Sequence, residues 1–236
     1  MYSFKSFITE SFGYLEEKLA QGGFDYENKV ADTLKKHGLM SKDTKTAGSS
    51  GDAPDAHMNI GGKQHSLEVK KDKGAMMGQI ELHHNDEHGW HISPKAKAKY
   101  PKTAEHIEKS GFIDHVNKQW KKPSGDYHTD LKMGNVYHNV QGTAPIAAHY
   151  HHDRKTPYMQ VGNGHGLFHL HKDAANLGTS KLSGNTQLRA RMKARSTDKV
   201  TGKRKYGALI VMSLKDAGHS SVDLDKHTKQ IAASHA

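Results

Sequence analysis

Two stretches of the chain alternate hydrophobic and polar residues in the way that β-strands do. The first covers residues 55–70 and is divided by Gly61-Gly62, a pair that suits the two-residue turn of an antiparallel hairpin. The second covers residues 188–195, where small or apolar residues alternate strictly with arginine and lysine. Because successive side chains on a strand point to opposite faces, this second stretch should pack one face inward and line the other with four positive charges.

The turn of the first stretch fixes the register of its two strands. If Ile60 pairs with Lys63, stepping outward places Asp55 directly opposite Glu68. Their Cβ atoms would then lie roughly 5 Å apart. The strand period of two also places Lys70 on the same face as Glu68. Like charges that face each other repel, so the pattern predicts a cation beside the two carboxylates.

A hard divalent ion suits this pair of carboxylates. Mg²⁺ takes oxygen ligands, keeps several waters and is usually held by one or two carboxylates together with substrate phosphate. Such an ion lowers the pKa of a bound water and stabilises the charge that develops on a phosphate. Lys70 would then orient the water or neutralise the phosphate. The alternative is a surface hairpin whose Glu68 and Lys70 face solvent, and the Glu-x-Lys spacing alone favours that alternative.

Helical spacing follows Glu27, because Val30, Ala31 and Leu34 lie three, four and seven residues further along. This spacing places Glu27 on the inward face of a helix, where an acid needs a partner. The rest of the pattern predicts helices over residues 75–83, 103–109, 112–120 and 144–152, and strands over residues 90–93, 158–161, 167–170 and 206–214. The strand over 206–214 should pair with the basic strand, and the chain from residue 217 should be frayed.

Pro54-Asp55, twelve further residues and Glu68-Val69-Lys70 resemble the Pro-Asp…(Asp/Glu)-x-Lys signature of the PD-(D/E)XK nuclease superfamily. That superfamily includes restriction enzymes, phage exonucleases and junction resolvases. The resemblance implies that Asp55 and Glu68 ligate one or two Mg²⁺ or Mn²⁺ ions, with help from the Val69 carbonyl. It also implies that Lys70 assists a metal-activated water in hydrolysing DNA to a 5′-phosphate and a 3′-hydroxyl.

Two further positions match the family pattern. Several branches place a glutamate on the first core helix, as Glu27 would be, where it serves a second metal or a water. Some branches carry a glutamine on the helix after the lysine, as Gln79 would be, to orient the site or touch DNA. The resemblance therefore covers about residues 24–82. It implies an α/β, restriction-endonuclease-like fold with a mixed central sheet flanked by helices, here with a β-rich basic C-terminal extension.

The charge of the chain favours a nucleic-acid partner. The formal net charge is +10 at pH 7, and such a charge attracts polyanions. A row of basic side chains on one strand face suits a phosphate backbone better than base edges, although a solvated strand face remains the alternative. The residues expected to contact DNA are Arg189, Arg191, Lys193, Arg195, Lys71 and Lys73.

Composition narrows the remaining chemistry. The chain has no cysteine, which excludes disulfides and thiolate sites, and no stretch is apolar enough to span a bilayer. It has twenty histidines, six of which form two clusters, at residues 149–152 and 165–171. No spacing among them matches a zinc signature, but a His-site metallonuclease, in which Asp55 and Glu68 are dispensable, remains an alternative.

The N-terminal residues 1–19 have an amphipathic pattern. They resemble the capsid-targeting leaders of internal head proteins in large contractile-tailed phages, which a prohead protease clips after an (Ile/Leu)-x-Glu triplet. Ile8-Thr9-Glu10 and Leu15-Glu16-Glu17 both satisfy that triplet. An ordinary docking helix is the alternative. The resemblance implies a location in the phage virion interior or the host bacterial cytoplasm.

The expected organisation is a leader or docking helix at 1–20, a nuclease core at 21–120, a polar linker or insertion at 121–142, a β-rich basic DNA-contacting region at 143–216 and a tail at 217–236. The preferred function is a phage-encoded, metal-dependent deoxyribonuclease, an endonuclease by expectation. Resolvase-like members of similar size often dimerise, so a homodimer belongs to this expectation, although the sequence shows no clear interface stripe. A non-catalytic DNA-binding internal head protein is the alternative from another class.

Overall fold

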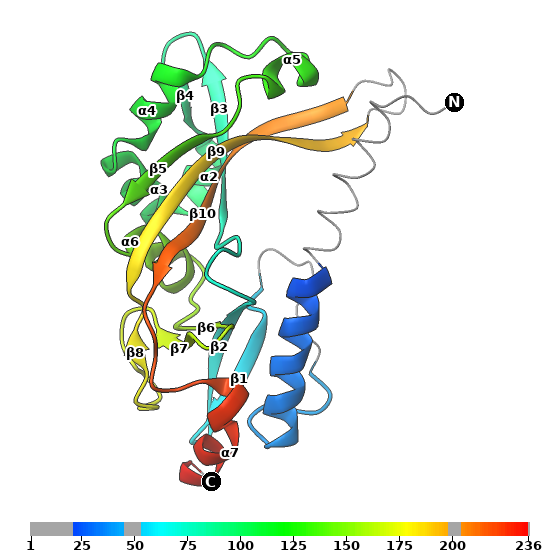
Figure 1. The fold of residues 1–236 in the computed structure, drawn as a ribbon, viewed down its shortest axis with the longest axis vertical. Helices are drawn as coiled ribbons and strands as arrows, with labels where there is room; N and C mark the ends of the chain where they lie inside the picture. Colours follow the sequence, from blue (N-terminus) through cyan, green and yellow to red (C-terminus); the bar gives the residue numbers. More distant parts are fainter. Residues whose placement is uncertain (1–20, 45–52, 198–203, 236) are drawn as a thin grey trace. The chain divides into compact units, whose positions relative to one another are not determined.

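The computed structural model describes residues 21–44, 53–197 and 204–235. These residues form a mixed α/β structure with two five-stranded sheets (Figure 1), which confirms the coarse α/β class. The chain divides into two compact units, each built from segments that are not contiguous in sequence. The first unit comprises the described residues up to Asp72, Thr156–Ser180 and the described residues from His219 onward. The second unit comprises Lys73–Lys155 and the described part of Lys181–Gly218.

The first unit contains a helix over residues 21–36 and a mixed sheet. The sheet has the order β1-β2-β6-β7-β8, and its strands are β1 (Ala56–Ile60), β2 (Lys63–Lys70), β6 (Tyr158–Val161), β7 (Gly166–His169) and β8 (Ser180–Lys181). Strands β1 and β2 are antiparallel, β2 and β6 are parallel, and β6 and β7 are antiparallel. The predicted hairpins at residues 55–70 and 158–170 are therefore confirmed.

The core of this unit forms between the helix over 21–36 and the apolar face of the hairpin. Val30, Ala31 and Leu34 of the helix belong to one buried cluster with Leu67 and Val69 of β2. The predicted inward face of the helix is confirmed. The alternation along β2, in which Leu67 and Val69 face the core, leaves Glu68 and Lys70 on the opposite side of the strand.

The chain end belongs to the same core. Helix α7 (Leu224–Ser234) buries Leu224 and Ile231 in that cluster, so the prediction of a frayed end from residue 217 is wrong. These two residues are seven apart and lie two turns apart on one face of the helix, which packs against the core. Asp223 caps its first turn by accepting a hydrogen bond from the Asp225 backbone N–H.

The second unit contains an antiparallel sheet with helices on one side (Figure 1). The order is β4-β3-β10-β9-β5, and the strands are β3 (Gln79–Asn85), β4 (Gly89–Ile92), β5 (Val136–Val140), β9 (Gly184–Thr197) and β10 (Arg204–Ala217). The helices are α2 (Pro94–Lys99), α3 (Pro101–Lys109), α4 (Phe112–Gln119), α5 (Tyr127–Leu131), α6 (Ala144–Ala147) and the π-helix η1 (Ala148–Asp153).

The basic strand is confirmed as part of β9. Leu188, Ala190 and Met192 are buried, whereas Arg189 and Arg191 between them are partly exposed. Strand β10 pairs with β9 as predicted. One face of the sheet therefore carries the apolar core of the unit and the other carries the positive charges.

One local prediction is wrong in this unit. Residues 75–83 do not form a helix; β3 begins at Gln79, and Ile80 and Leu82 are buried with the period of a strand. Gly78 adopts φ +112°, a conformation that interrupts a helix. Residues 121–142, expected as a linker or insertion, contain α5 and β5, and β5 pairs with β9 at the sheet edge. Strand β5 lies at the edge of the sheet and alternates buried or partly buried with exposed residues, so part of this segment is polar.

Candidate active site

The β1–β2 hairpin brings Asp55 together with Glu68 and Lys70. The paired residues of the hairpin run from Ile60↔Lys63 to Ala56↔Leu67, and Asp55 directly precedes β1. The Val69 backbone N–H donates a hydrogen bond to Asp55 Oδ2 over 2.9 Å. Lys70 Nζ lies 2.5 Å from Glu68 Oε1 and 3.6 Å from Asp55 Oδ2. A single ammonium group therefore contacts both carboxylates.

Both carboxylates are withdrawn from solvent. Asp55 is 8% exposed and Glu68 is 2% exposed. Ionised groups in such positions need charged partners, because burial removes most of their hydration energy. Lys70 supplies one positive charge for the two acids. The trio therefore keeps a formal surplus of one negative charge when both acids are ionised.

Glu27 adds a third acid to this group from the helix over 21–36. Burial raises the pKa of Glu27 to about 7, and the negative charges of Asp55 and Glu68 add to that rise, while Lys70 opposes it. The charges of the three hairpin side chains thus lie close enough to Glu27 to influence its protonation.

The donor set of this group suits a hard divalent ion in part. Among residues 21–44, 53–197 and 204–235, no three His, Asp or Glu side chains converge in a metal-binding geometry. Mg²⁺, however, is commonly held by one or two carboxylates, with water and substrate phosphate filling its other positions. The surplus negative charge of Asp55, Glu68 and Glu27 fits a cation. Lys70 competes for the same oxygens, so an ion would have to share or displace its contacts.

The remaining predicted site residues are divided between the two units. Lys71 follows β2 in the first unit and is exposed, whereas Lys73 opens the second unit and is also exposed. Gln79 belongs to the second unit, where it begins β3 instead of lying on a helix. The structure therefore gathers Asp55, Glu68 and Lys70 in one unit and leaves Gln79 in the other.

Gln79 shares a sheet face with the predicted DNA-contacting residues. In the register of the sheet, Gln79 pairs with Val211, Val211 with Arg189, and Arg189 with Tyr137. Cross-strand partners project to the same side, so these four residues form one row across β3, β10, β9 and β5. We call the side that carries Arg189, Arg191, Lys193 and Arg195 the basic face.

Arg195 of the basic face forms an ion pair within the sheet. The Arg195 guanidinium donates a hydrogen bond to Glu81 Oε1, and the two form an ion pair. Partial burial of Glu81 would raise its pKa, but the hydrogen bond and charge of Arg195 outweigh burial and lower it. The guanidinium lies over Gly207, where an added Cβ would be 3.1 Å from Arg195 Nη2. Arg189 and Lys193 make no ion pair with another described residue.

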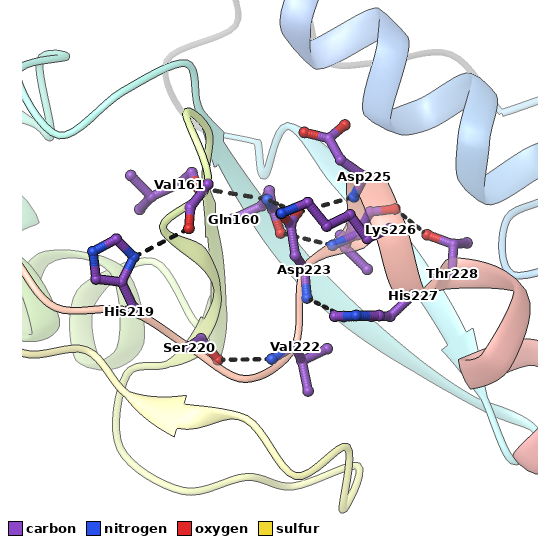
Figure 2. Close-up of polar contacts among 12 residues, drawn as sticks. Gln160, Val161, His219, Ser220, Val222, Asp223, Asp225, Lys226, His227 and Thr228 are labelled. Atoms are coloured by element: carbon purple, nitrogen blue, oxygen red, sulfur yellow. Dashed lines mark hydrogen bonds and ion pairs between the residues drawn. The ribbon is translucent and has the colours of Figure 1, made fainter.

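A buried polar network near the acids was not apparent in the sequence. Gln160 of β6 is completely buried; its Nε2 donates to Asp223 Oδ1 over 2.9 Å, and its Oε1 accepts from the Leu224 N–H over 3.2 Å. Figure 2 shows Gln160 directed at Asp223 before α7. Gln160 Nε2 also lies 3.2 Å from the Tyr26 hydroxyl, which donates to Asp225. Because Tyr26 precedes Glu27, this network anchors the helix that carries Glu27.

The histidine clusters do not assemble a metal site among the described residues. His149 lies in η1, where its Nδ1 is 3.4 Å from Thr103 Oγ1. His169 Nδ1 lies 3.0 Å from the Thr179 carbonyl, and His165 stacks on His219 with ring centroids 4.9 Å apart. These histidines serve packing and hydrogen bonding within their own units.

The leader-like residues 1–20, with both candidate cleavage triplets, lie outside the described part of the chain. Within the described residues, no helix combines the length and apolar character that crossing a membrane requires. Comparisons of the chain with protein-family models, curated proteins and solved structures found no match.

Proposed function

We propose that the protein is a metal-dependent DNA nuclease of the PD-(D/E)XK type. The observation that supports this proposal best is the buried group of Asp55, Glu68 and Lys70 on one hairpin, with Glu27 coupled to it electrostatically. Burying two carboxylates side by side costs stability, and burial with perturbed protonation is typical of functional sites. A surface hairpin would leave Glu68 in solvent, whereas Glu68 is 2% exposed.

In this proposal, Asp55 and Glu68 hold one Mg²⁺ or Mn²⁺ ion, and Glu27 serves a second ion or a water. A bound ion supplies a water of lowered pKa and stabilises negative charge on the phosphate. Lys70, whose ammonium group contacts both acids, would orient the attacking water or neutralise the phosphate. Water adds to phosphorus as the bond to the 3′ oxygen breaks, which leaves a 5′-phosphate and a 3′-hydroxyl.

The decisive experiment is cleavage of plasmid DNA in Mg²⁺, Mn²⁺ or EDTA. Lys70→Ala and Glu68→Gln should each lower the metal-dependent rate by about 100-fold or more, because each removes a group that acts on the water or the ion. Lys63→Ala is the matched control, since Lys63 is an exposed lysine on the same strand. If Glu68→Gln still cleaves DNA at the wild-type rate, the assignment is contradicted. It is also contradicted if histidine substitutions, and not Glu68→Gln, abolish cleavage.

A non-catalytic DNA-binding protein is the second candidate, and one observation favours it. Lys70 contacts both carboxylates, so the group is partly compensated without any metal. In this case the nuclease core would persist as a scaffold, as in an internal head protein delivered with a phage genome. Clean wild-type protein would then bind DNA but fail to cut it in either metal. A folded Lys70→Ala variant would bind DNA as well as wild type.

A further inference from the structure

The basic face of the second unit combines positive charge with an exposed aromatic ring. The helices of this unit pack against the opposite, apolar face: Phe112 of α4 stacks on His138 of β5, and Tyr206 of β10 hydrogen-bonds Asp130 of α5. Tyr137, next to His138 on β5, therefore projects from the basic face. It is 49% exposed, and the other described large hydrophobic residues with such exposure are Met76 and Leu131.

Tyr137 stands directly beside Arg189. The two are cross-strand partners at the edge of the sheet, and the Tyr137 hydroxyl accepts a hydrogen bond from Asn135 Nδ2 over 3.3 Å. Lys193 lies four residues further along β9 on the same face, with Arg191 between them. An aromatic ring therefore sits at one end of a line of positive charges.

At the other edge of the sheet, the face carries imidazole rings. His83 of β3 pairs with His91 of β4, and Glu81 precedes them on the same side of β3. The side chain of His83 is 52% exposed. Histidine, like tyrosine, can stack on an unpaired base. The basic face is thus bordered by rings on both edges, with the basic side chains of β9 between them.

We propose that the basic face binds single-stranded nucleic acid, with phosphates on Arg189 and Lys193 and a base stacked on Tyr137. A duplex buries the faces of its bases, so Tyr137 could add nothing to duplex binding, whereas basic grooves with aromatic platforms are typical of single-strand binding. Arg189 and Lys193 are four residues apart on β9, so their Cα atoms are spaced by about 13.6 Å. An unstacked strand can extend beyond the 3.4 Å rise per nucleotide of a duplex and match that spacing.

The ion pair of Glu81 with Arg195 limits this surface. The Glu81 carboxylate takes the place that a phosphate would occupy on the Arg195 guanidinium, because both ligands present paired oxygens to the same fork. The proposal therefore assigns phosphate binding to Arg189 and Lys193. Arg195 is left out, because its guanidinium is paired with Glu81. This proposal rests on the proposed function, which makes nucleic acid the partner. It adds that the nucleic acid is single-stranded.

The test measures binding in EDTA, so that no hydrolysis can contribute. Fluorescence anisotropy would compare an oligothymidine of about 20 nucleotides, an oligouridine and a duplex of equal length, each longer than one expected site. Wild-type protein should bind at least one of the single strands about tenfold more tightly than the duplex. Tyr137→Ala should weaken single-strand binding by about 5- to 100-fold and change duplex binding less than about twofold, because stacking is lost only where bases are unpaired.

Two further variants separate stacking from charge. Tyr137→Phe keeps the ring and should retain wild-type affinity, which excludes a role for the hydroxyl. The double variant Arg189→Gln and Lys193→Gln should weaken both ligands and reduce the salt slope for single strands by about 1.4, since two phosphate contacts are removed. Lys118→Gln, an exposed lysine on α4 at the helical side of the unit, is the matched control and should leave both affinities unchanged.

Equal single-strand affinity in Tyr137→Ala and wild type, or tighter binding of the duplex by wild type, would overturn the proposal. The affinities for oligothymidine and oligouridine show whether the strand is DNA or RNA. Failure here is distinguishable from failure of the nuclease assignment. A protein that binds single strands in EDTA but cuts nothing in Mg²⁺ or Mn²⁺ contradicts only the nuclease. One that cuts DNA but lacks the Tyr137 effect contradicts only the single-strand surface.

Discussion

At the scale of single residues, Asp55 and Glu68 repel each other and need a positive charge nearby. Lys70 of the same hairpin provides it. The alternation predicts that Asp55 and Glu68 face each other, and the structure places Lys70 Nζ within 4 Å of both. The repulsion is therefore relieved internally in this structure. A divalent ion would act as a competitor of Lys70, which makes metal binding and lysine removal thermodynamically linked.

This competition predicts how Lys70→Ala changes stability. Removing the ammonium takes away the positive charge that contacts both buried carboxylates, which should lower the free energy of unfolding by about 3 kcal/mol. Mn²⁺ should restore part of that loss, because an ion that binds only the folded state stabilises it by mass action. Thermal unfolding of both proteins with and without Mn²⁺ would measure this. If Mn²⁺ does not change the melting temperature of Lys70→Ala, no ion binds at the site.

Glu27 should make stability depend on pH. Its folded-state pKa of about 7 lies above the ordinary value of 4.5, so the folded protein retains a proton that the unfolded chain has lost between those values. The free energy of unfolding should therefore fall as pH rises from about 4.5 to about 7. Glu27→Gln removes this fall and should be more stable than wild type at pH 8 by about 1 kcal/mol, a figure reduced for solvent screening of a half-exposed group.

Urea unfolding of wild type and Glu27→Gln at pH 5 and pH 8 would check this expectation. The difference between the two proteins should be small at pH 5 and favour the variant at pH 8. An unchanged difference across that range would mean that Glu27 titrates normally and lies further from the hairpin acids than the structure indicates. Asp32→Asn is a suitable control, because Asp32 is an exposed acid on the same helix.

At the scale of elements, the chain end stabilises the helix that carries Glu27. Asp223 caps α7 and accepts a hydrogen bond from Gln160, and α7 supplies Asp225 to the Tyr26 hydroxyl and to Lys29, whose Nζ lies 2.8 Å away. Burial raises the pKa of Tyr26 far above its ordinary range, and so Tyr26 remains a hydrogen-bond donor at every relevant pH. The network joins three elements that are distant in sequence.

Gln160→Leu should test that network. The substitution leaves the buried Asp223 carboxylate with one fewer donor and the Leu224 N–H without its acceptor, which should cost about 2 kcal/mol of unfolding free energy. Hydrogen exchange should show faster opening of both α7 and the helix over 21–36. Gln64→Leu, on an exposed position of β2, provides the control. Accelerated exchange confined to β6 would show that the network does not couple the helices.

The elements also show which parts of the fold local sequence can predict. The hairpin at residues 55–70 and the strand at 188–195 are predictable, because alternation and a Gly-Gly turn act over a few residues. Helix α7 escapes prediction, because its stability comes from Leu224 and Ile231 packing against residues far away in the chain. Gln79 is misassigned to a helix for the same reason, since Ile80 and Leu82 gain their burial from pairing with β10.

At the scale of the whole molecule, the division into two units separates the acids from the basic face. Segments at residues 73–155 and 181–218 interrupt the unit that contains the acids. No local pattern reports such an interruption, because the contacts that close each unit join distant segments. The chemistry proposed for the hairpin and the binding proposed for the basic face can therefore be tested by separate substitutions in one intact chain.

The charge of the molecule predicts one further effect, through Glu81. With a net charge of +10, binding to nucleic acid should weaken steeply as salt rises. Glu81→Gln removes the carboxylate that pairs with Arg195 and frees a guanidinium for phosphate. We expect tighter binding at low salt and a salt slope for single strands steeper by about 0.7, which corresponds to one added contact. Glu87→Gln removes the same charge from an exposed position on the β3–β4 turn and controls for net charge. Equal slopes in the two variants would show that Arg195 does not reach the nucleic acid, because only long-range attraction would then have changed.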